Sequence, residues 1–542
     1  MGQRILGFRL LAAVAVGAVL ISGCLGSERS ERSPATANAQ GMVAASTADA
    51  VSFHPYKTTD TASSEYQGLV YGGSLITRDP QNPEQFIGNF AESWTVSEDR
   101  LTYTFTLRPN LRWSDGQPLT AFDFKWTYDQ ASKPENGWPY ISNLEEIESY
   151  EAPDERTIVV RLKEPLAVGL ELADPIVPLP KHIWERLDWN DPNRNPEIMK
   201  PTVGAGPFRL LEWIKDDHAT FVPNEYYFKG RPKLEQYTIR IAGNPQIAFQ
   251  WLRTGEVDRS SFTPADYEAA KRLEHVTVYE WWPATGNWSY IGFNLRQPLL
   301  QDVRVRQALA YAVDRQAIID RVLYGLAQPI YSAYGPTCWC YNPDVPRRDY
   351  DPAKARELLD AAGFLPGPDG IRVKDGQRLQ LRLLFGPNSN RVREQIATIV
   401  QESFKQIGVG VEVTGLEWAA YLSALRSPTG WDMNVGGWQA TVDPHWMYQI
   451  WSEENIPDLN AGAYVNKQVE ELFKQGAREF DRERRKQIYQ EIQRILAEDQ
   501  PYIFLYMPKS YEGINKRIAG IKPSPLGLDW NIEEWYVAQP GR

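Results

Sequence analysis

The sequence predicts an α/β fold in which helices cover the faces of β-sheets. Segments with an apolar residue at every second position recur along the chain, and this period is typical of half-buried strands. Amphipathic segments alternate with them, with capping residues at the start and glycine at the end, as helices have. We find no self-similarity with a period of about 20 to 50 residues, which argues against a solenoid or a propeller. The mixture of strands and helices throughout therefore favours α/β lobes.

The first half of the chain predicts mainly strands. Residues 42–45 predict a short opening strand, and 101–107 predict a strand with one buried face because apolar and polar residues alternate there. Thr120 and Asp123 have the spacing of a capping box and so predict the start of a helix. A further alternating segment, 156–162, predicts another strand.

The second half predicts longer helices. Four segments combine helical periodicity with capping residues or a closing glycine: 302–325, 351–363, 392–408 and 469–495. The last of these is expected to be a pair of helices. Alternating or continuous apolar residues predict strands directly after the third and fourth segments: 409–413 and 502–507.

The N-terminus has the features of a targeting segment. Two arginines precede an apolar run of twelve residues, Leu10 to Ile21, which is too short to cross a hydrocarbon core of about 30 Å comfortably. The run ends in ISGC, which resembles the lipobox of bacterial lipoproteins and implies a signal peptide of residues 1–23 and a lipid on Cys24. An ordinary signal peptide with a chance cysteine is the alternative. Residues 24–40 lack aromatic side chains and predict a flexible tether.

We therefore expect an extracytoplasmic protein, in the periplasm or on the cell surface, that the lipid on Cys24 anchors to a membrane. The length of 542 residues allows two to four domains of roughly 150 residues each. The net charge of −11 argues against a nucleic-acid partner, whose phosphates would repel such a chain.

Several enzyme classes are disfavoured by missing motifs. The sequence has no Gly-x-Ser-x-Gly elbow, no His-Glu-x-x-His and no phosphate-binding Gly-x-x-x-x-Gly-Lys-Ser/Thr loop. Its five histidines lack metal-ligand spacing, so neither a dedicated zinc site nor a cofactor is expected. A secreted glycoside hydrolase stays as a remote alternative, because 69 acidic residues leave room for a catalytic carboxylate pair. We expect a binding protein and not an enzyme.

Cys338 and Cys340 leave three alternatives open. An oxidising compartment permits a disulfide, although a bond between residues two apart needs unusual geometry. Two free thiols are the second alternative. A Cys-x-Cys metal pair is the third, and neither another cysteine nor clustered histidines complete it.

Four longer segments carry a resemblance to a known family. The most specific is AESWTVSEDRLTYTFTLRPNLRWSDGQPLTAFDFKWTYD, residues 91–129. The others are VGAGPFRLLEW, YIGFNLRQPLLQDVRVRQALAYAVDR and YDPAKARELLDAAGF. Together, and in this order behind the lipobox, they resemble the extracytoplasmic solute-binding proteins of peptide and nickel ABC transporters, family 5, of the oligopeptide- and dipeptide-binding type. The resemblance covers roughly residues 42–536.

The resemblance implies a two-lobed periplasmic-binding-protein fold, type II-like, with an additional α/β domain, as in the large class C architecture. It implies a discontinuous lobe I of residues 41–75, 203–292 and 510–542, an additional domain II of residues 76–202, and a lobe III of residues 293–509. A monomer is implied, which closes about a hinge around a solute and delivers it to the permease subunits of an ABC transporter.

One motif bears directly on the ligand. In peptide-binding members of the family, a Gly-Trp pair is followed after two residues by an aspartate that pairs with the amino terminus of the peptide. Gly437 and Trp438 match the pair here, but Thr441 stands at the aspartate position and cannot neutralise an ammonium group. Asp443, two residues further on, either replaces the missing acid or caps the helix that follows.

Aromatic residues complete the predicted ligand surface. Trp418 and Trp438 match tryptophans that line the pocket of peptide-binding members, and flat aromatic faces stack on apolar side chains, proline rings and sugar rings. Four further residues are candidates for the same surface, with a place in the core as the alternative: Trp282, Trp288, Trp138 and Tyr140.

The ligand class follows from these matches and mismatches. An oligopeptide is our first hypothesis because most of the family is so described. An oligosaccharide is the second, favoured by the many tryptophans and by Thr441 in place of an acid. Nickel or a nickel chelate is the third.

Overall fold

The computed structural model describes residues 40–386 and 391–538. The predicted signal peptide, the lipidation site Cys24 and residues 24–39 of the predicted tether lie outside the described residues. Among the helices of these two ranges, none combines the length and apolar character needed to cross a membrane.

The largest sheet has seven strands in the order β12-β22-β11-β1-β10-β9-β8. Its strands are β1 (Gly41–Ser46), β8 (Phe208–Ile214), β9 (His218–Pro223), β10 (Gln236–Ile241), β11 (Arg259–Ser260), β12 (Val276–Trp281) and β22 (Ser510–Asn515). The predicted opening strand is thus confirmed as β1, at the centre of the sheet. Met42 and Ala44 pack into the cluster that includes α1 (Thr61–Tyr71), whereas Val43 packs on the other face against α5 (Pro245–Thr254). Helices therefore cover both faces.

A separate antiparallel sheet of four strands follows the order β4-β5-β7-β6. Its strands are β4 (Ala91–Val96), β5 (Thr102–Leu107), β6 (Ile147–Glu151) and β7 (Thr157–Leu162), and the strands predicted over 101–107 and 156–162 are confirmed. The helix α2 (Ala121–Ala131) packs on this sheet. The Asp123 carboxylate accepts hydrogen bonds from the backbone N–H and the hydroxyl of Thr120, at 2.8 and 3.1 Å, so the predicted pairing of these residues is present.

A third sheet has six strands in the order β14-β21-β13-β20-β18-β19. Its strands are β13 (Trp288–Phe293), β14 (Ala327–Pro329), β18 (Gln380–Phe385), β19 (Gly410–Gly415), β20 (Met433–Trp438) and β21 (Tyr502–Pro508). In β21, Tyr502 and Phe504 pack into one apolar cluster, and Ile503 and Leu505 pack into another. Since successive strand side chains point to opposite faces, both faces of this sheet are buried.

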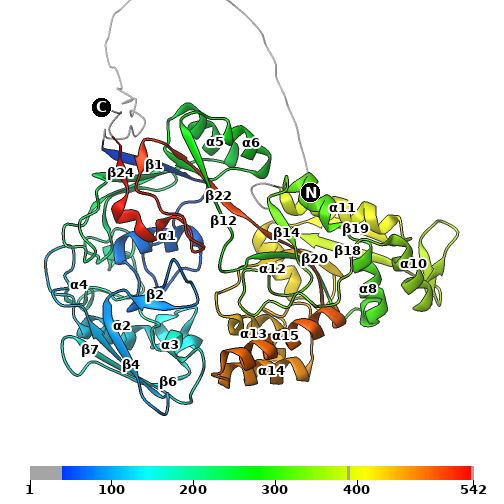
Figure 1. Cartoon of the computed structure of the whole chain (residues 1–542), viewed down its shortest axis with the longest axis horizontal. Helices are drawn as coiled ribbons and strands as arrows, with labels where there is room; N and C mark the ends of the chain where they lie inside the picture. Colours follow the sequence, from blue (N-terminus) through cyan, green and yellow to red (C-terminus); the bar gives the residue numbers. More distant parts are fainter. Residues whose placement is uncertain (1–39, 387–390, 539–542) are drawn as a thin grey trace, which may run out of the picture. The chain divides into compact units, whose positions relative to one another are not determined.

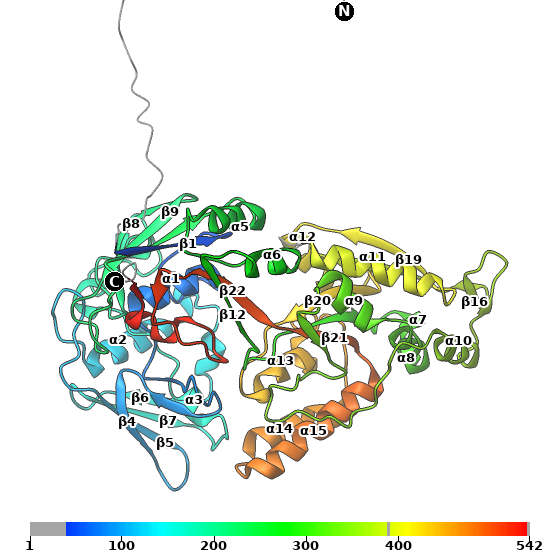
Figure 2. The same ribbon diagram turned by 45° about the horizontal axis from the view of Figure 1, so that its top comes forward.

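Two groups of helices cover the six-stranded sheet (Figure 2). One face carries α8 (Val303–Tyr311), α9 (Arg315–Val322), α10 (Pro352–Ala361) and α11 (Val392–Lys405). The other face carries α13 (Tyr448–Trp451), α14 (Lys467–Arg478) and α15 (Arg482–Asp499). The predicted helix over 351–363 is confirmed as α10, the helix over 392–408 as α11, and the helical pair as α14 and α15. The predicted strands at 409–413 and 502–507 are β19 and β21.

The remaining α-helices and β-strands are short. The helices are α3 (Gly169–Leu172), α4 (Lys181–Trp184), α6 (Tyr267–Lys271), α7 (Pro298–Gln301) and α12 (Trp418–Arg426). The strands are β2 (Ile76–Arg78), β3 (Phe86–Gly88), β15 (Leu365–Pro366), β16 (Arg372–Lys374), β17 (Gln377–Arg378), β23 (Ile518–Ala519) and β24 (Tyr536–Val537).

The prediction of one continuous helix over 302–325 is wrong, because the segment forms two helices, α8 and α9. Asp314 interrupts it: its backbone is extended, and its side chain accepts a hydrogen bond from the N–H of Ala317 at 2.9 Å to cap α9. The apolar stripe continues across the break because both helices pack on the same sheet face. Gly325 follows α9 with a φ of 79°, a left-handed conformation that favours glycine.

The chain passes twice between the seven-stranded and the six-stranded sheets (Figure 1). It first leaves β12 and enters β13, and it later leaves β21 and enters β22. The outgoing and returning strands pair with each other in both sheets, so that Trp281 lies opposite Ser510, and Ser289 lies opposite Tyr506. Two paired crossing segments of this kind are the expected position of a hinge.

Candidate ligand-binding site

A cavity of about 280 Å³ lies where β13 begins and β20 and β21 end, near the crossing segments. We call it the aromatic cavity. Trp288 and Trp438 both line it, and they are direct partners in the register of β13 and β20. The Trp438 ring lies parallel to that of Tyr290, with centroids 6.3 Å apart. A Cβ atom at Gly436 would lie 2.5 Å from Cζ of Tyr290, so glycine is needed there for Tyr290 to take its place beside Trp438.

Arg393 connects the aromatic cavity to Trp418. Trp418 is the first residue of α12, and 45 % of its surface is exposed. The Arg393 guanidinium lies 5.0 Å from the centre of the Trp418 ring and also lines the aromatic cavity. Arg393 therefore contacts one of the two tryptophans matched to the family pocket and shares a cavity lining with the other. Sequence reasoning missed Arg393, because the helix over 392–408 was identified by its apolar stripe and nothing local distinguishes this arginine.

The structure gives Thr441 and Asp443 local roles. The Thr441 hydroxyl is exposed and donates to the backbone carbonyl of Asp443 at 2.8 Å. Asp443 accepts from the N–H of His445 at 2.9 Å, which is the capping role considered above. Both carboxylate oxygens of Asp443 also accept from Arg485, at 2.6 and 2.8 Å. The charge of Asp443 is therefore already neutralised.

The Asp443–Arg485 pair is mostly withdrawn from water. The two side chains are 13 and 9 % exposed, and Arg485 donates in addition from Nε to the carbonyl of Gly476 at 2.8 Å. The pair borders a second cavity of about 290 Å³, which Trp339 and Phe480 also line. Arg485 lies on α15, 42 residues after its partner, and no local signal in the sequence links the two residues.

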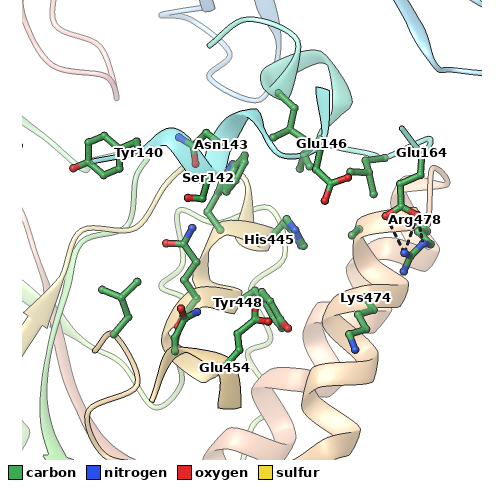
Figure 3. A pocket seen from close by; sticks show the side chains of 18 of the residues that line it. Tyr140, Ser142, Asn143, Glu146, Glu164, His445, Tyr448, Glu454, Lys474 and Arg478 are labelled. Atoms are coloured by element: carbon green, nitrogen blue, oxygen red, sulfur yellow. Dashed lines mark hydrogen bonds and ion pairs between the residues drawn. The ribbon is translucent and has the colours of Figure 1, made fainter. Parts of the chain in front are cut away.

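A third cavity has a volume of about 610 Å³, and we call it the large cavity. One wall comes from residues 139–172, next to the four-stranded sheet, and the other comes from residues 445–478, next to the six-stranded sheet. Figure 3 shows Glu146 pointing from the first wall toward His445 and Tyr448 on the second. Tyr140, one of the predicted aromatic candidates, lines this cavity and is 48 % exposed.

His445 adds no positive charge to the large cavity at neutral pH. Burial lowers the pKa of its imidazole to about 4, and the attraction of Asp443 only partly opposes this. The ring therefore stays neutral at pH 7 and does not repel a cation. Within residues 40–386 and 391–538, we find no group of three or more histidine, cysteine, aspartate or glutamate side chains placed to hold a metal ion.

Two further predicted aromatic residues, Trp138 and Trp282, and the cysteine pair complete the set of candidates. Trp138 is only 8 % exposed and packs edge-on against Tyr56, with ring centroids 5.1 Å apart. Trp282 is partly buried near the first crossing segment, where Nζ of Lys509 lies 5.4 Å from its ring. Neither residue, nor Thr441, lines any of the three cavities described here. Of the three alternatives for Cys338 and Cys340, the structure has the disulfide.

Contacts between the two walls close one side of the large cavity. Arg478 donates to the Glu164 carboxylate at 2.8 and 2.9 Å, and the N–H of Ala167 donates to the carbonyl of Ala477 at 2.7 Å. Nε1 of Trp446 donates to Glu171 at 3.2 Å. We call these three contacts the clasp. The clasp joins the four-stranded-sheet region to the helices of the six-stranded sheet.

The fold and these cavities define a class of protein: two α/β lobes joined by paired crossing segments, with an aromatic cavity near the crossing. Residues 85–457 match the family model described as bacterial extracellular solute-binding proteins, family 5. The chain belongs to this family.

Similar proteins support the assignment. The oligopeptide-binding protein AppA of Bacillus subtilis is 30 % identical over 551 aligned positions, which cover 99 % of this chain and 100 % of AppA. The solved structure of AppA with a nonapeptide has a TM-score of 0.79 at 29 % identity, covering 94 % of this chain and 100 % of that one. The structure of NikZ from Campylobacter jejuni with Ni(L-His) has a TM-score of 0.79 at 26 % identity, covering 91 and 99 %. The resemblance seen in the sequence and the two-lobed α/β fold are confirmed.

Proposed function

We propose that this chain is the substrate-binding component of an ABC importer and that it captures oligopeptides between its two lobes. The observation that carries the proposal is the aromatic cavity beside the two crossing segments, where Trp288, Trp438 and Arg393 converge. Closure about the crossing segments would enclose a solute there, and a ligand favours the closed state only through contacts that it makes in that state. The similarity to the oligopeptide-binding protein AppA, whose structure was solved with a nonapeptide, supports a peptide as the solute.

The same proposal includes the division into domains. Lobe I would contain residues 41–75, 203–292 and 510–542, and strands from all three segments take part in the seven-stranded sheet. Domain II would contain residues 76–202 with the four-stranded sheet, and lobe III would contain residues 293–509. The six-stranded sheet also includes β13, which begins at Trp288, a few residues before that boundary.

The partners follow from this role. The closed monomer would deliver its ligand to the permease subunits of the transporter and would break no bond in it.

A lipid on Cys24 would hold the protein at the membrane outside the cytoplasm. The anchor is tested by replacing Cys24 with serine: we expect the variant to lose incorporated radiolabelled palmitate and to leave the membrane fraction. A variant that still carries the label would contradict the anchor but not the binding role.

Replacing Trp438 with alanine is expected to weaken peptide binding about tenfold. Loss of a stacked aromatic contact removes about 0.5–1.5 kcal/mol beyond the burial itself, and 1.4 kcal/mol corresponds to a factor of ten. Isothermal titration calorimetry with a peptide that copurifies with the protein, identified by mass spectrometry, measures the change. Trp438→Phe is the matched control, because it keeps a ring that can stack on Tyr290 and should retain most of the affinity.

Unchanged affinity of Trp438→Ala, with an unchanged melting temperature, would remove Trp438 from the binding surface.

Thermal-shift panels of peptides and oligosaccharides test the ligand class. Stabilisation by a β-linked oligosaccharide and by no peptide would contradict the proposed function.

Breaking the clasp is expected to lower the affinity for peptides only slightly. Arg478 and Glu164 are 53 and 37 % exposed, and such ion pairs contribute about 0–1 kcal/mol because water and salt screen them. Arg478→Gln should therefore lower peptide affinity by less than about threefold and should reduce the difference between affinities measured at low and high salt. Fluorescence titration at two salt concentrations checks both effects. A tenfold loss of peptide affinity that does not depend on the salt concentration would contradict this small electrostatic contribution of the clasp.

A further inference from the structure

We propose that the large cavity receives a positively charged amino group of the ligand and that Glu146 and Glu454, on its opposite walls, hold it. This inference rests on the proposed function and deepens it, because it assigns the amino terminus of a bound peptide to a different place from the Trp438 motif. The chemical class of ligand that the cavity selects is a primary ammonium group next to an extended chain.

The sites where an acid is expected offer no free negative charge. Thr441 is uncharged, and the carboxylate of Asp443 is engaged by Arg485 through two hydrogen bonds. None of the residues that line the aromatic cavity is acidic, and Arg393 brings positive charge there. An ammonium group at the aromatic cavity would therefore find aromatic rings but no opposite charge.

The charged side chains that line the large cavity are not balanced. Among the residues that line it, the charge of Glu164 is balanced by Arg478 through two hydrogen bonds, and His445 is neutral. Two carboxylates, Glu146 and Glu454, and one cation, Lys474, remain. In the described part of the chain, neither carboxylate has a hydrogen-bond or ion-pair partner for its oxygens. The cavity therefore carries an excess of negative charge.

The two carboxylates couple ligand binding to closure of the cavity. Glu146 lies in the region of the four-stranded sheet, whereas Glu454 follows α13 on the other wall (Figure 3). Bringing two like charges to the same cavity opposes closure, because the two carboxylates repel each other. An ammonium group between them removes this repulsion and interacts more strongly with the closed than with the open arrangement. The ligand would thereby select the closed state.

The cavity also offers contacts suited to such a group. The Tyr448 ring lies parallel to the neutral His445 ring, with centroids 6.3 Å apart, and both residues line the cavity. An aromatic face attracts a nearby cation. Asn143 and Tyr140 provide polar groups from the opposite wall.

The sequence provides matched controls. Glu145 and Glu453 stand directly beside the two proposed residues and do not line the cavity, and Glu453 is paired with Lys467 instead. Replacing Glu145 or Glu453 with glutamine therefore makes the same chemical change one residue away, outside the proposed site.

The test is a binding experiment with paired ligands. A synthetic mixture of lysine-free peptides of about two to nine residues is made once with free and once with acetylated amino termini, and the best binder of the mixture is titrated in both forms by calorimetry. The wild-type protein should bind the free form at least about tenfold more tightly. Glu146→Gln and Glu454→Gln should each reduce that preference several-fold, and the double variant should abolish it with little change in affinity for the acetylated form. Glu145→Gln and Glu453→Gln should behave as wild type.

Equal affinity for the two forms in the wild type, or a preference that survives the double variant, would overturn the inference while leaving peptide binding intact. Binding of no peptide from either mixture would instead refute the proposed function. A melting temperature within about 2 °C of wild type for each variant shows that a changed preference comes from the site and not from unfolding.

Discussion

Replacing Arg485 with methionine is expected to lower the free energy of unfolding by about 3–5 kcal/mol, because it leaves the largely buried Asp443 carboxylate without its partner. The pair is bidentate, at 2.6 and 2.8 Å, and both side chains are largely buried. The substitution also removes the donor to the carbonyl of Gly476. Urea denaturation followed by tryptophan fluorescence measures the change in midpoint and slope.

Two further variants separate the ion pair from simple loss of packing. Arg484→Met replaces the exposed neighbour and should change the stability by less than about 0.5 kcal/mol. The double variant Arg485→Met, Asp443→Asn should recover a large part of the loss, because asparagine can still cap the following turn and no charge remains unpaired. A double variant that is no more stable than Arg485→Met would contradict this account.

Lowering the pH from 7 to 4 is expected to remove about 3 kcal/mol of stability through His54 alone. His54 is fully buried, and its ring lies edge-on to Trp184 and Trp189, with centroids 5.0 and 4.7 Å away. Nδ1 accepts from the N–H of Tyr56 at 3.2 Å, and Nε2 lies 3.1 Å from the carbonyl of Trp189. Both ring nitrogens are therefore satisfied in the neutral form, with the proton on Nε2.

The direction of the pH effect on stability follows from the difference between the pKa of His54 in the folded protein and in the unfolded chain. Burial, assisted by the charge of Lys57, lowers the pKa of His54 to about 3 in the folded protein, against 6.5 for the free side chain. Below pH 6.5 the unfolded chain takes up a proton that the folded protein refuses until about pH 3. Each pH unit in this window costs about 1.4 kcal/mol, so stability falls as the pH falls. His445, whose pKa burial lowers to about 4, acts in the same direction.

The measurement is the urea midpoint as a function of pH for the wild type and for His54→Gln. The variant should be less stable than the wild type at pH 7. Between pH 6.5 and 4 it should lose about 3 kcal/mol less stability than the wild type loses. Parallel curves for the two proteins would show that His54 does not titrate as described.

Much of the fold could be predicted because its signals are local. The alternation over 101–107 and the capping pattern of Thr120 with Asp123 appear in the structure as expected. The segment over 302–325 was the exception. Its apolar stripe depends on the sheet that both helices face, and the stripe conceals the break at Asp314.

Less of the candidate site could be predicted. Trp438 and Trp288 line one cavity, and Tyr140 lines another, but the role of each in ligand binding stays a prediction. Arg393, Glu146 and Glu454 were not singled out, because each is an ordinary polar residue in its own segment. Their importance comes from the neighbours that the fold brings to them.

The sequence by itself determined the α/β class, the elements and the family, since periodicity, capping and ordered motifs act over a few neighbouring residues or a few tens of residues. Only the tertiary structure decided that Asp443 is neutralised by a residue 42 positions away, and that Glu146 shares a cavity with Glu454. Charge balance in a site depends on distances between segments far apart in the chain. No local pattern encodes those distances. A carboxylate can therefore bind a ligand or form a structural ion pair, and the residues that the fold places beside it decide which.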